Sequence, residues 1–306
     1  MAVVVVEDLH KQYGDNHAVR GLSFTVEEGE VFAIVGPNGA GKTTTVEILE
    51  GHRRPSSGRV EVAGFDPATG GRAFRERIGI VLQECGIEER FSVRELVTLH
   101  AGLYPSPRGI DEVIALVGLT GKADERTKTL SGGQRRRLDL ALGLIGDPDV
   151  LFLDEPTTGF DPSARRQAWD VVAGLCEVGK TVILTTHYME EAYRLADRVA
   201  VVAAGELVAL GTPDELVDRV AGGRVVIEFR LPPDVDVSRL PPVVGDLQAD
   251  GHVVVVETVS PTGDLAVLTR WAVVHDVEFE QLRLRHGSFE EAYLDLIGAA
   301  TRSGDG

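Results

Sequence analysis

Cysteine is scarce in this sequence, which contains only Cys85 and Cys176. The two lie far apart and in no metal-ligand spacing, so the sequence offers neither a disulfide framework nor a cysteine-based metal site. This usage suits a reducing compartment, and we expect two ordinary packed thiols.

Long hydrophobic runs are also missing. The longest uncharged apolar stretches, such as residues 199–205, are far shorter than the ~20 residues that a membrane span requires. The N-terminus, MAVVVVEDLHKQYG, has no charged leader followed by a sustained apolar run, so we expect no signal peptide. These features predict a cytoplasmic protein, in which any membrane function would need a partner that supplies the spans.

Positive charge is in deficit, with 31 Lys and Arg against 48 Asp and Glu and a net charge of −17. An acidic surface repels phosphate backbones and anionic lipid, which disfavours general nucleic-acid coating and broad electrostatic adhesion to membranes. With 306 residues, of which 43% are hydrophobic, the chain is long enough for a sizeable core.

Short apolar runs alternate with helical patterns over the first two thirds of the chain. This β-α-β rhythm predicts a parallel sheet, interrupted by amphipathic helices between about residues 92 and 118. The predicted strands are residues 3–7, 22–26, 31–35, 60–62, 78–82, 150–153 and 181–186, and a helix is predicted at 163–178.

The pattern changes near residue 222, after which we expect a small α+β domain. Its predicted strands are residues 224–231, 252–258, 265–269 and 277–285, with a loop and a short helix at 232–244 and a final helix at 288–298 that ends in Gly298. The last six residues have the composition of a disordered tail.

Residues 36–43 read GPNGAGKT, a full match to the phosphate-binding loop G-x-x-x-x-G-K-[ST]. Glycines let backbone N–H groups approach phosphate oxygens, and the helix that follows adds its positive end. Lys42 would reach the β- and γ-phosphates, and the Thr43 hydroxyl would bind Mg²⁺. The predicted nucleotide contacts here are Gly36, Pro37, Asn38, Gly39, Ala40, Gly41, Lys42, Thr43 and Thr44.

Residues 150–155 read VLFLDE, an apolar strand that ends in two carboxylates. Asp154 is placed to hold the magnesium shell, and Glu155 to polarise an attacking water as a general base. The simpler alternative is an acidic turn after a buried strand.

LSGGQ at residues 130–134 precedes a helix that begins RRR. The order GPNGAGKT, Gln83, LSGGQRRR, VLFLDEPTTGFD and TTH resembles the ATP-binding cassette (ABC) family over roughly residues 3–217. We expect the basic run Arg135–Arg137 to be a solvated helix face rather than a second anion site.

The resemblance implies a head-to-tail dimer that sandwiches two ATP molecules, each between the phosphate loop of one copy and the LSGGQ of the other. Ser131, Gly132, Gly133 and Gln134 would then contact a γ-phosphate through a helix N-terminus. Hydrolysis removes that phosphate and would loosen the dimer.

Further roles come from the same resemblance. His187 matches the histidine that contacts the γ-phosphate and holds the attacking water, and Gln83 matches the glutamine that touches Mg²⁺ and this water. Asp161 matches the aspartate that communicates across the dimer. Tyr13 fits the aromatic that stacks on adenine, with a surface tyrosine near a turn as the alternative.

The predicted fold is α/β: a P-loop ATPase core with a parallel sheet, an antiparallel β subdomain and a helical subdomain at about 84–148. The predicted domains are residues 1–221 and an α+β accessory domain at 222–306. GAGKTTTVEILEG, LVALGTPDEL and the ending RLRHGSFEEAYLDLIG resemble the drug-resistance and polysaccharide export branch. This branch places two ATPase copies beneath separate membrane permease subunits at the inner face of the plasma membrane. Gln83 and residues 90–103 would there receive a helix of the permease.

Two alternatives stay open: a cassette that acts on ribosomes or DNA, and a non-catalytic ATP-binding scaffold. A single cassette, the absence of a long heptad run and the acidic charge disfavour the first. The complete set of hydrolytic positions disfavours the second.

Overall fold

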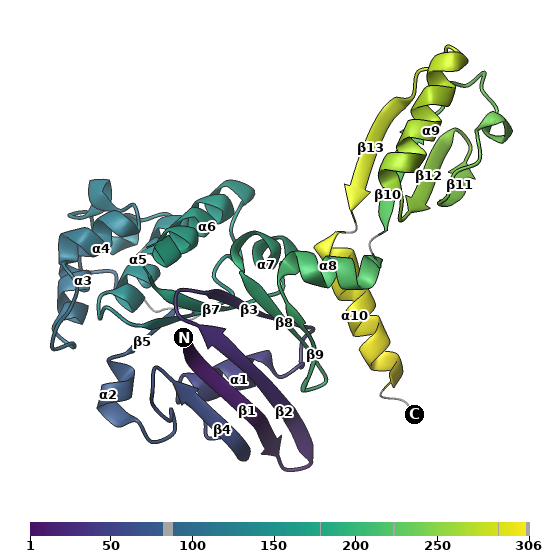
Figure 1. Ribbon diagram of the computed structural model, residues 1–306. Coiled ribbons are helices and arrows are strands. Elements are labelled where there is room, and N and C mark those ends of the chain that lie inside the picture. Colours follow the sequence, from purple (N-terminus) through teal and green to yellow (C-terminus); the bar gives the residue numbers. More distant parts are fainter. Residues whose placement is uncertain (82–87, 178, 223, 287, 304–306) are drawn as a thin grey trace. The chain divides into compact units, whose positions relative to one another are not determined.

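The computed structural model of the chain describes residues 1–81, 88–177, 179–222, 224–286 and 288–303. By their contacts the residues form two compact units, Met1–Pro213 with Ala299–Gly306 and Asp214–Gly298 (Figure 1). The two units divide between Pro213 and Asp214, eight residues before the predicted domain boundary between residues 221 and 222. The predicted boundary itself stays a prediction.

A six-stranded sheet forms the centre of the larger unit, with the order β5-β6-β7-β3-β8-β9. All of its pairings are parallel except that of β8 with the edge strand β9. The strands β3 and β7 are buried at every position, as expected where both faces of a parallel sheet are covered. The bounds are β3 Val31–Val35, β5 Ile78–Val81, β6 Val150–Asp154, β7 Thr181–Thr186, β8 Arg198–Ala203 and β9 Glu206–Gly211.

A second, antiparallel sheet has the order β2-β1-β4. It comprises β1 (Ala2–Tyr13), β2 (Asn16–Glu27) and β4 (Ser57–Val62). Helix α1 (Lys42–Leu49) lies between this sheet and the central one (Figure 1). Side chains from both sheets and from α1 join in one buried cluster, in which the rings of Phe24 and Phe32 stack with centroids 5.2 Å apart.

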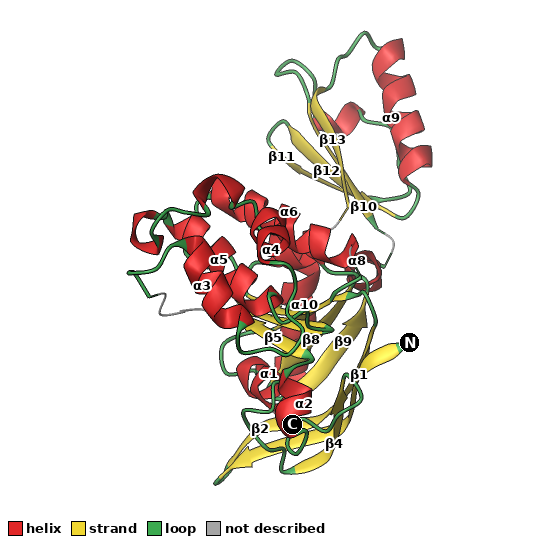
Figure 2. Ribbon diagram, turned by 90° about the vertical axis from the view of Figure 1, so that its left-hand side faces the viewer, coloured by secondary structure: helices red, strands yellow, loops and turns green. Residues whose placement is uncertain are grey.

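Helices cover the other face of the central sheet (Figure 2). Helix α5 contacts β5, α6 contacts β7, and α7 contacts β3 and β7, while α3 and α4 pack on each other and on α5 as the predicted helical insertion. The bounds are α2 Gly71–Arg75, α3 Val93–Ala101, α4 Ile110–Leu116, α5 Gly132–Leu144, α6 Pro162–Glu177 and α7 Met189–Leu195, with 3₁₀ turns at Thr120–Lys122 and Thr127–Thr129.

The smaller unit is built on an antiparallel sheet of the order β11-β12-β10-β13, with α9 along one face (Figure 2). Every second residue of β10 is buried, and Ile227 and Phe229 pack in one cluster with Leu268 of α9. The bounds of the elements from residue 213 onward are α8 Pro213–Ala221, β10 Val225–Arg230, β11 Asp246–Asp250, β12 Val253–Thr258, α9 Pro261–Val274, β13 Glu280–His286 and α10 Phe289–Ser303, with a 3₁₀ turn at Val237–Arg239; the last residues of α10 belong to the larger unit.

Two predictions for this region are wrong. Residues 265–269 were predicted as a strand but lie inside α9, which begins at Pro261 and buries Leu268 and Ala272 one turn apart. A short apolar run fits a buried strand and a buried helix equally, and Pro at the first helical position favours the helix. Helix α10 also continues past Gly298 to Ser303.

Among the described residues, no helix has both the length and the apolar character that a membrane span requires.

Candidate active site

The loop of residues 36–41 joins the buried strand β3 to helix α1. Two of its glycines have no room for a side chain. A Cβ on Gly36 would lie 2.1 Å from the carbonyl oxygen of Val202, and one on Gly41 would lie 2.3 Å from that of Ala18. Gly41 also has a φ of 98°, in the left-handed region that favours glycine. The loop can therefore pack closely on its neighbours only with glycine at these positions.

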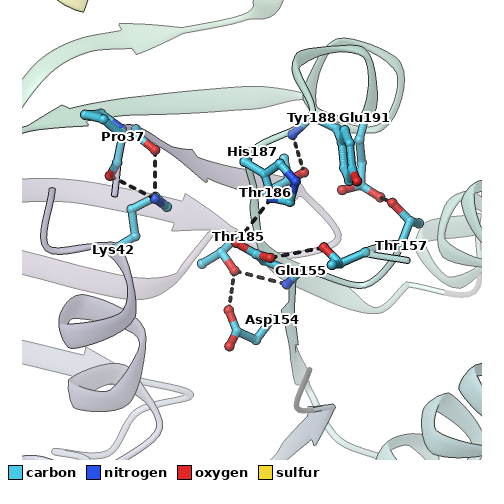
Figure 3. Close-up of polar contacts among 12 residues, drawn as sticks. Pro37, Lys42, Asp154, Glu155, Thr157, Thr185, Thr186, His187, Tyr188 and Glu191 are labelled. Atoms are coloured by element: carbon cyan, nitrogen blue, oxygen red, sulfur yellow. Dashed lines mark hydrogen bonds and ion pairs between the residues drawn. The ribbon is translucent and has the colours of Figure 1, made fainter. Parts of the chain in front are cut away.

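Lys42 is buried at the first position of α1. Its Nζ donates to the carbonyl oxygens of Gly36, at 2.7 Å, and Pro37, at 3.1 Å (Figure 3). Burial lowers the pKa of Lys42, and the negative charges of Glu155 and Asp154 oppose this effect. The ammonium group is thus held beside the loop, with two carboxylates near it.

A cavity of about 290 Å³ lies over the loop and α1. It combines backbone N–H groups, an ammonium group, hydroxyls and carboxylates around one space, the donor and acceptor set that a nucleotide with a metal ion needs. The residues that line it are Tyr13, Asn16, Ala18, Asn38, Gly39, Ala40, Gly41, Lys42, Thr43, Thr44, Asp154, Glu155 and Thr185.

Asp154 is the last residue of β6, and its side chain is oriented from the neighbouring strand. The Thr185 hydroxyl of β7 donates to Asp154 Oδ1 at 2.6 Å (Figure 3). Because the carboxyl ends of the parallel strands β6 and β7 meet at one edge, this carboxylate faces the same cavity as the phosphate loop.

Glu155 begins the segment after β6 with a φ of 45°, a left-handed conformation that is rare for a residue other than glycine. The strand β7 holds this backbone, because the Glu155 N–H donates to the Thr185 carbonyl oxygen at 3.1 Å. Its Oε2 accepts from the Thr158 hydroxyl at 3.0 Å, and its Oε1 lies 3.3 Å from His187 Nδ1. Two of the three predicted catalytic side chains, Glu155 and His187, are therefore adjacent.

His187 follows β7, and its side chain is 44% exposed. Its ring lies against the Tyr188 ring, with centroids 4.1 Å apart, and the guanidinium of Arg165 lies 4.1 Å from the centroid on Tyr188. The Tyr188 N–H donates to Thr186 Oγ1 at 3.0 Å (Figure 3). The His187 ring is thus supported by Tyr188, which in turn contacts Arg165 of α6, and it stays partly exposed.

The LSGGQ residues form the N-terminus of α5. Ser131 is the N-cap, and its side chain accepts from the Gln134 N–H while Gln134 Oε1 accepts from the Ser131 N–H, at 3.3 and 2.9 Å. Ser131 and Gly132 are exposed. None of Ser131, Gly132, Gly133 and Gln134 is among the described residues that line the cavity, so the loop and LSGGQ of one chain are separate surfaces.

The remaining predicted residues fall in different places. Tyr13 lines the cavity and is 40% exposed. The Asp161 carboxylate accepts from the N–H groups of Ser163 and Ala164, both at 2.9 Å, and so caps α6. Gln83 lies outside the described residues.

The prediction of a solvated face for Arg135–Arg137 fits Arg135, whose side chain is 38% exposed, but is wrong for Arg136. Arg136 donates to the carbonyl oxygens of Asp154 and Pro156, both at 3.1 Å, and so fixes the backbone on either side of Glu155. Sequence reasoning missed this link between the LSGGQ helix and the acidic segment. No local signal could have found it, because the partners are main-chain atoms 18 and 20 residues away.

Glu191 of α7 is a second residue that the sequence did not single out. It is fully buried, and its Oε1 accepts from the Thr157 hydroxyl at 2.8 Å and from Trp169 Nε1 at 2.9 Å (Figure 3). This carboxylate ties the segment after Glu155 to α6 and α7, the helix after His187.

Glu50, at the end of α1, predicts a pH effect on stability. Burial, with the charges of Asp154 and Glu47, raises its pKa from 4.5 to about 8, while His52 Nδ1 lies 3.2 Å from its Oε2. The folded protein therefore keeps a proton that the unfolded chain releases, and the free energy of unfolding falls as the pH rises from about 4.5 to about 8.

The variant Glu50→Gln tests this effect in urea unfolding. Because Gln resembles the protonated acid, the free energy of unfolding of this variant should be close to that of wild type at pH 5. At pH 9 it should be more stable than wild type by roughly 2–4 kcal/mol. Glu28→Gln, at an exposed carboxylate, is the control; an equal gain at both pH values would contradict the prediction.

The fold and the site together define a P-loop nucleoside triphosphatase. A family model described as ABC transporter matches residues 19–158, and one described as ABC transporter domain-containing protein-like, C-terminal domain, matches residues 225–288. The chain is 38% identical to the daunorubicin resistance ATP-binding protein DrrA3 of Streptomyces coeruleorubidus, over 96% of each chain. It is 40% identical to the Nod factor export ATP-binding protein I of Rhizobium sp. (strain N33), over 94% of each chain.

Among solved structures, cbiO1 from Clostridium perfringens, part of the ABC transporter complex cbiONQ, has a TM-score of 0.64 and 31% identity. It covers 72% of this chain and 94% of its own. The chain therefore belongs to the ABC transporter ATP-binding family, and it is an ATPase that binds ATP. The predicted family, fold class and activity are confirmed.

Proposed function

We propose that this chain powers export across a membrane through separate permease subunits, working as two copies with two ATP molecules between them. The observation that carries the proposal is the full-length similarity to proteins named for daunorubicin resistance and Nod factor export, which share the C-terminal unit as well as the cassette. The cargo would be a drug, antibiotic or lipid-like molecule, and the site of action the inner face of the plasma membrane.

The residues around the cavity suit ATP with Mg²⁺. The Thr43 hydroxyl and the Asp154 carboxylate both line it and are hard oxygen donors of the kind that Mg²⁺ prefers, and Gln83 completes the proposed set. Bound there, Mg²⁺ would neutralise charge on the β- and γ-phosphates. Lys42, the loop N–H groups of residues 36–44 and the N-terminus of α1 would bind the same phosphates, and Tyr13 the adenine.

Hydrolysis needs a base and a group that orients the water. Glu155 would accept a proton from the water as its oxygen bonds to the γ-phosphorus and the β-phosphate oxygen leaves. His187, 3.3 Å from the Glu155 carboxylate and partly exposed, would hold the γ-phosphate and this water. We assign contact with the same water to Gln83 as well, a residue outside the described part of the chain.

The separation of LSGGQ from the cavity supports the head-to-tail dimer. Residues 131–134 point an exposed helix N-terminus to solvent, an anion site that a γ-phosphate on a second copy would fill. Asp161, in the same interface, would communicate between the two sites. Once the γ-phosphate is cleaved, the contact between it and the LSGGQ helix N-terminus is lost, and the two copies separate.

The permease would dock beside the helical insertion. A cavity of about 840 Å³ is lined by Phe91, Leu96, Leu99 and His100 from the predicted region 90–103 and by Glu50 and Gly51 after α1. Leu99 is 56% exposed, and a cavity lined by both apolar and charged side chains suits an amphipathic helix.

A dimer test separates this proposal from a monomeric scaffold. In a Glu155→Gln background with Mg²⁺ and ATP, we expect a stable dimer in sedimentation velocity. Adding Ser131→Arg should return the protein to monomer, because a long cation replaces the N-cap at the LSGGQ surface. Calorimetry should still detect ATP binding by that monomer. A Glu155→Gln protein that stays monomeric, or a Ser131→Arg variant that still dimerises, would count against the sandwich.

The two alternatives predict other partners. A cassette that acts on ribosomes or DNA would co-purify with them, whereas the proposed subunit should co-purify with membrane proteins from detergent extracts. The net charge of −17 favours the second outcome.

A further inference from the structure

Two cations lie beside the ring of Tyr13. Lys11 Nζ is 5.0 Å from the ring centroid, and the guanidinium carbon of Arg53 is 5.6 Å from it. Both distances are within the range in which a cation is attracted to an aromatic face. Tyr13 is thus part of a small cluster, not an isolated surface tyrosine.

Arg53 is held in place from helix α1. Its Nε and Nη2 donate to the two carboxylate oxygens of Glu47, the second at 3.2 Å, and its N–H donates to the Glu47 carbonyl oxygen at 3.0 Å. The bidentate pair fixes the plane of the guanidinium. Glu47 keeps the pKa of Arg53 above its ordinary value, so the charge is permanent.

Lys11 is held by separate contacts of strand β1. It lies two residues before Tyr13 on β1, so the two side chains leave the same face of the strand. Its Nζ donates to the Arg54 carbonyl oxygen at 2.8 Å. The segment after α1 is itself docked on β1, since the Ser56 N–H donates to the His10 carbonyl oxygen at 2.8 Å.

The two cations are not part of the nucleotide cavity. Tyr13 lines this cavity, whereas neither Lys11 nor Arg53 is among the described residues that do so. The two cations therefore lie beside Tyr13 but outside the space that the nucleotide would fill. Helix α1 carries Lys42 at its start and Glu47 within it, so one rigid element connects the phosphate loop to the group that holds Arg53.

We propose that Arg53, tethered by Glu47 and assisted by Lys11, is a positioning residue that fixes the Tyr13 ring for stacking on adenine and so sets the affinity for the base of the nucleotide. The inference rests on the proposed nucleotide site and deepens it. Cations held against the ring restrict its motion, so less conformational freedom is lost when a base stacks on it. The contribution concerns the base only, because Arg53 does not line the space of the phosphates.

Kinetics of ATP hydrolysis by the full chain test this role. Arg53→Ala should raise KM for ATP about three- to tenfold and leave kcat within about twofold, since base stacking is equal in the ground and transition states. Arg53→Lys, which keeps the charge but loses the fork, should restore part of the affinity. Glu47→Gln should also raise KM, by freeing Arg53. Arg54→Ala, at an exposed neighbouring arginine, is the matched control and should match wild type.

A double-mutant cycle separates ring positioning from a general structural role. In a Tyr13→Ala background the Arg53→Ala change should have no further effect on KM, whereas additive effects or a loss of kcat would overturn the inference. Tyr13→Ala also tests the underlying site. If it leaves KM unchanged, the adenine contact of the proposed function is wrong; if it raises KM while Arg53→Ala does not, only the positioning role of Arg53 fails.

Discussion

Glu155→Gln should lower ATP turnover at saturating Mg²⁺ and ATP by about a hundredfold or more, as measured by steady-state phosphate release. The amide cannot accept the proton of the attacking water, whereas its size and its position on the left-handed backbone after β6 stay the same. The contacts of this side chain with Thr158 and His187 can largely persist, because an amide also donates and accepts hydrogen bonds. Affinity for ATP should therefore be kept while the chemical step is lost.

The control for this variant is Glu190→Gln, which neutralises an exposed carboxylate on α7 near the site. It should hydrolyse ATP at the wild-type rate. Turnover by Glu155→Gln equal to that of the parent would show that Glu155 is not the base.

Lys42→Ala should weaken ATP binding by roughly 30- to 1000-fold in a calorimetric titration, the range expected when one buried charge-assisted contact is removed. In the structure Nζ bonds to the carbonyl oxygens of Gly36 and Pro37, so it is already desolvated beside the loop and can turn to a phosphate at little entropic cost. Asp154 and Glu155 lie near enough to act on the pKa of Lys42. Without the ammonium group, their charges would face those of the phosphates directly.

Lys122→Ala is the matched control, since the Lys122 side chain is 40% exposed and pairs with Glu125 in the helical insertion. It removes the same charge and should leave ATP affinity unchanged. An affinity of Lys42→Ala within twofold of wild type would exclude Lys42 as a phosphate ligand.

Of the central sheet, β3, β5, β6 and β7 were predicted because nearly all of their residues are buried, whereas β8 and the edge strand β9 were not predicted. A strand such as Thr181–Thr186, covered on both faces, has to be apolar or internally bonded throughout, and this leaves a continuous run between turn residues. The edge strand β11, DLQAD, has no such run, since four of its five residues are exposed, and it was not predicted. In α9 the apolar residues fit either periodicity over a short window, which is why residues 265–269 were assigned to a strand.

The candidate site divides in the same way. A loop that binds phosphate through its backbone N–H groups needs glycine at defined positions, so residues 36–43 could be recognised from the sequence alone. Contacts of Arg136 with the carbonyl oxygens of Asp154 and Pro156 leave no such trace, because any backbone presents a carbonyl. The bond from Trp169 to Glu191 joins α6 to α7 and depends on how these helices pack.

The amino-acid sequence thus determined the chemistry of this protein: a glycine loop with Lys42, a strand ending in Asp154 and Glu155, and a helix opened by LSGGQ. Only the tertiary structure decided which of these groups share one cavity. It joins the loop, the two carboxylates and Tyr13, and it leaves Ser131 on a different surface. The physical reason is the order of the sheet, in which β6 and β3 both flank β7. Their carboxyl ends therefore meet across more than 100 residues of chain, a pairing that no local pattern encodes.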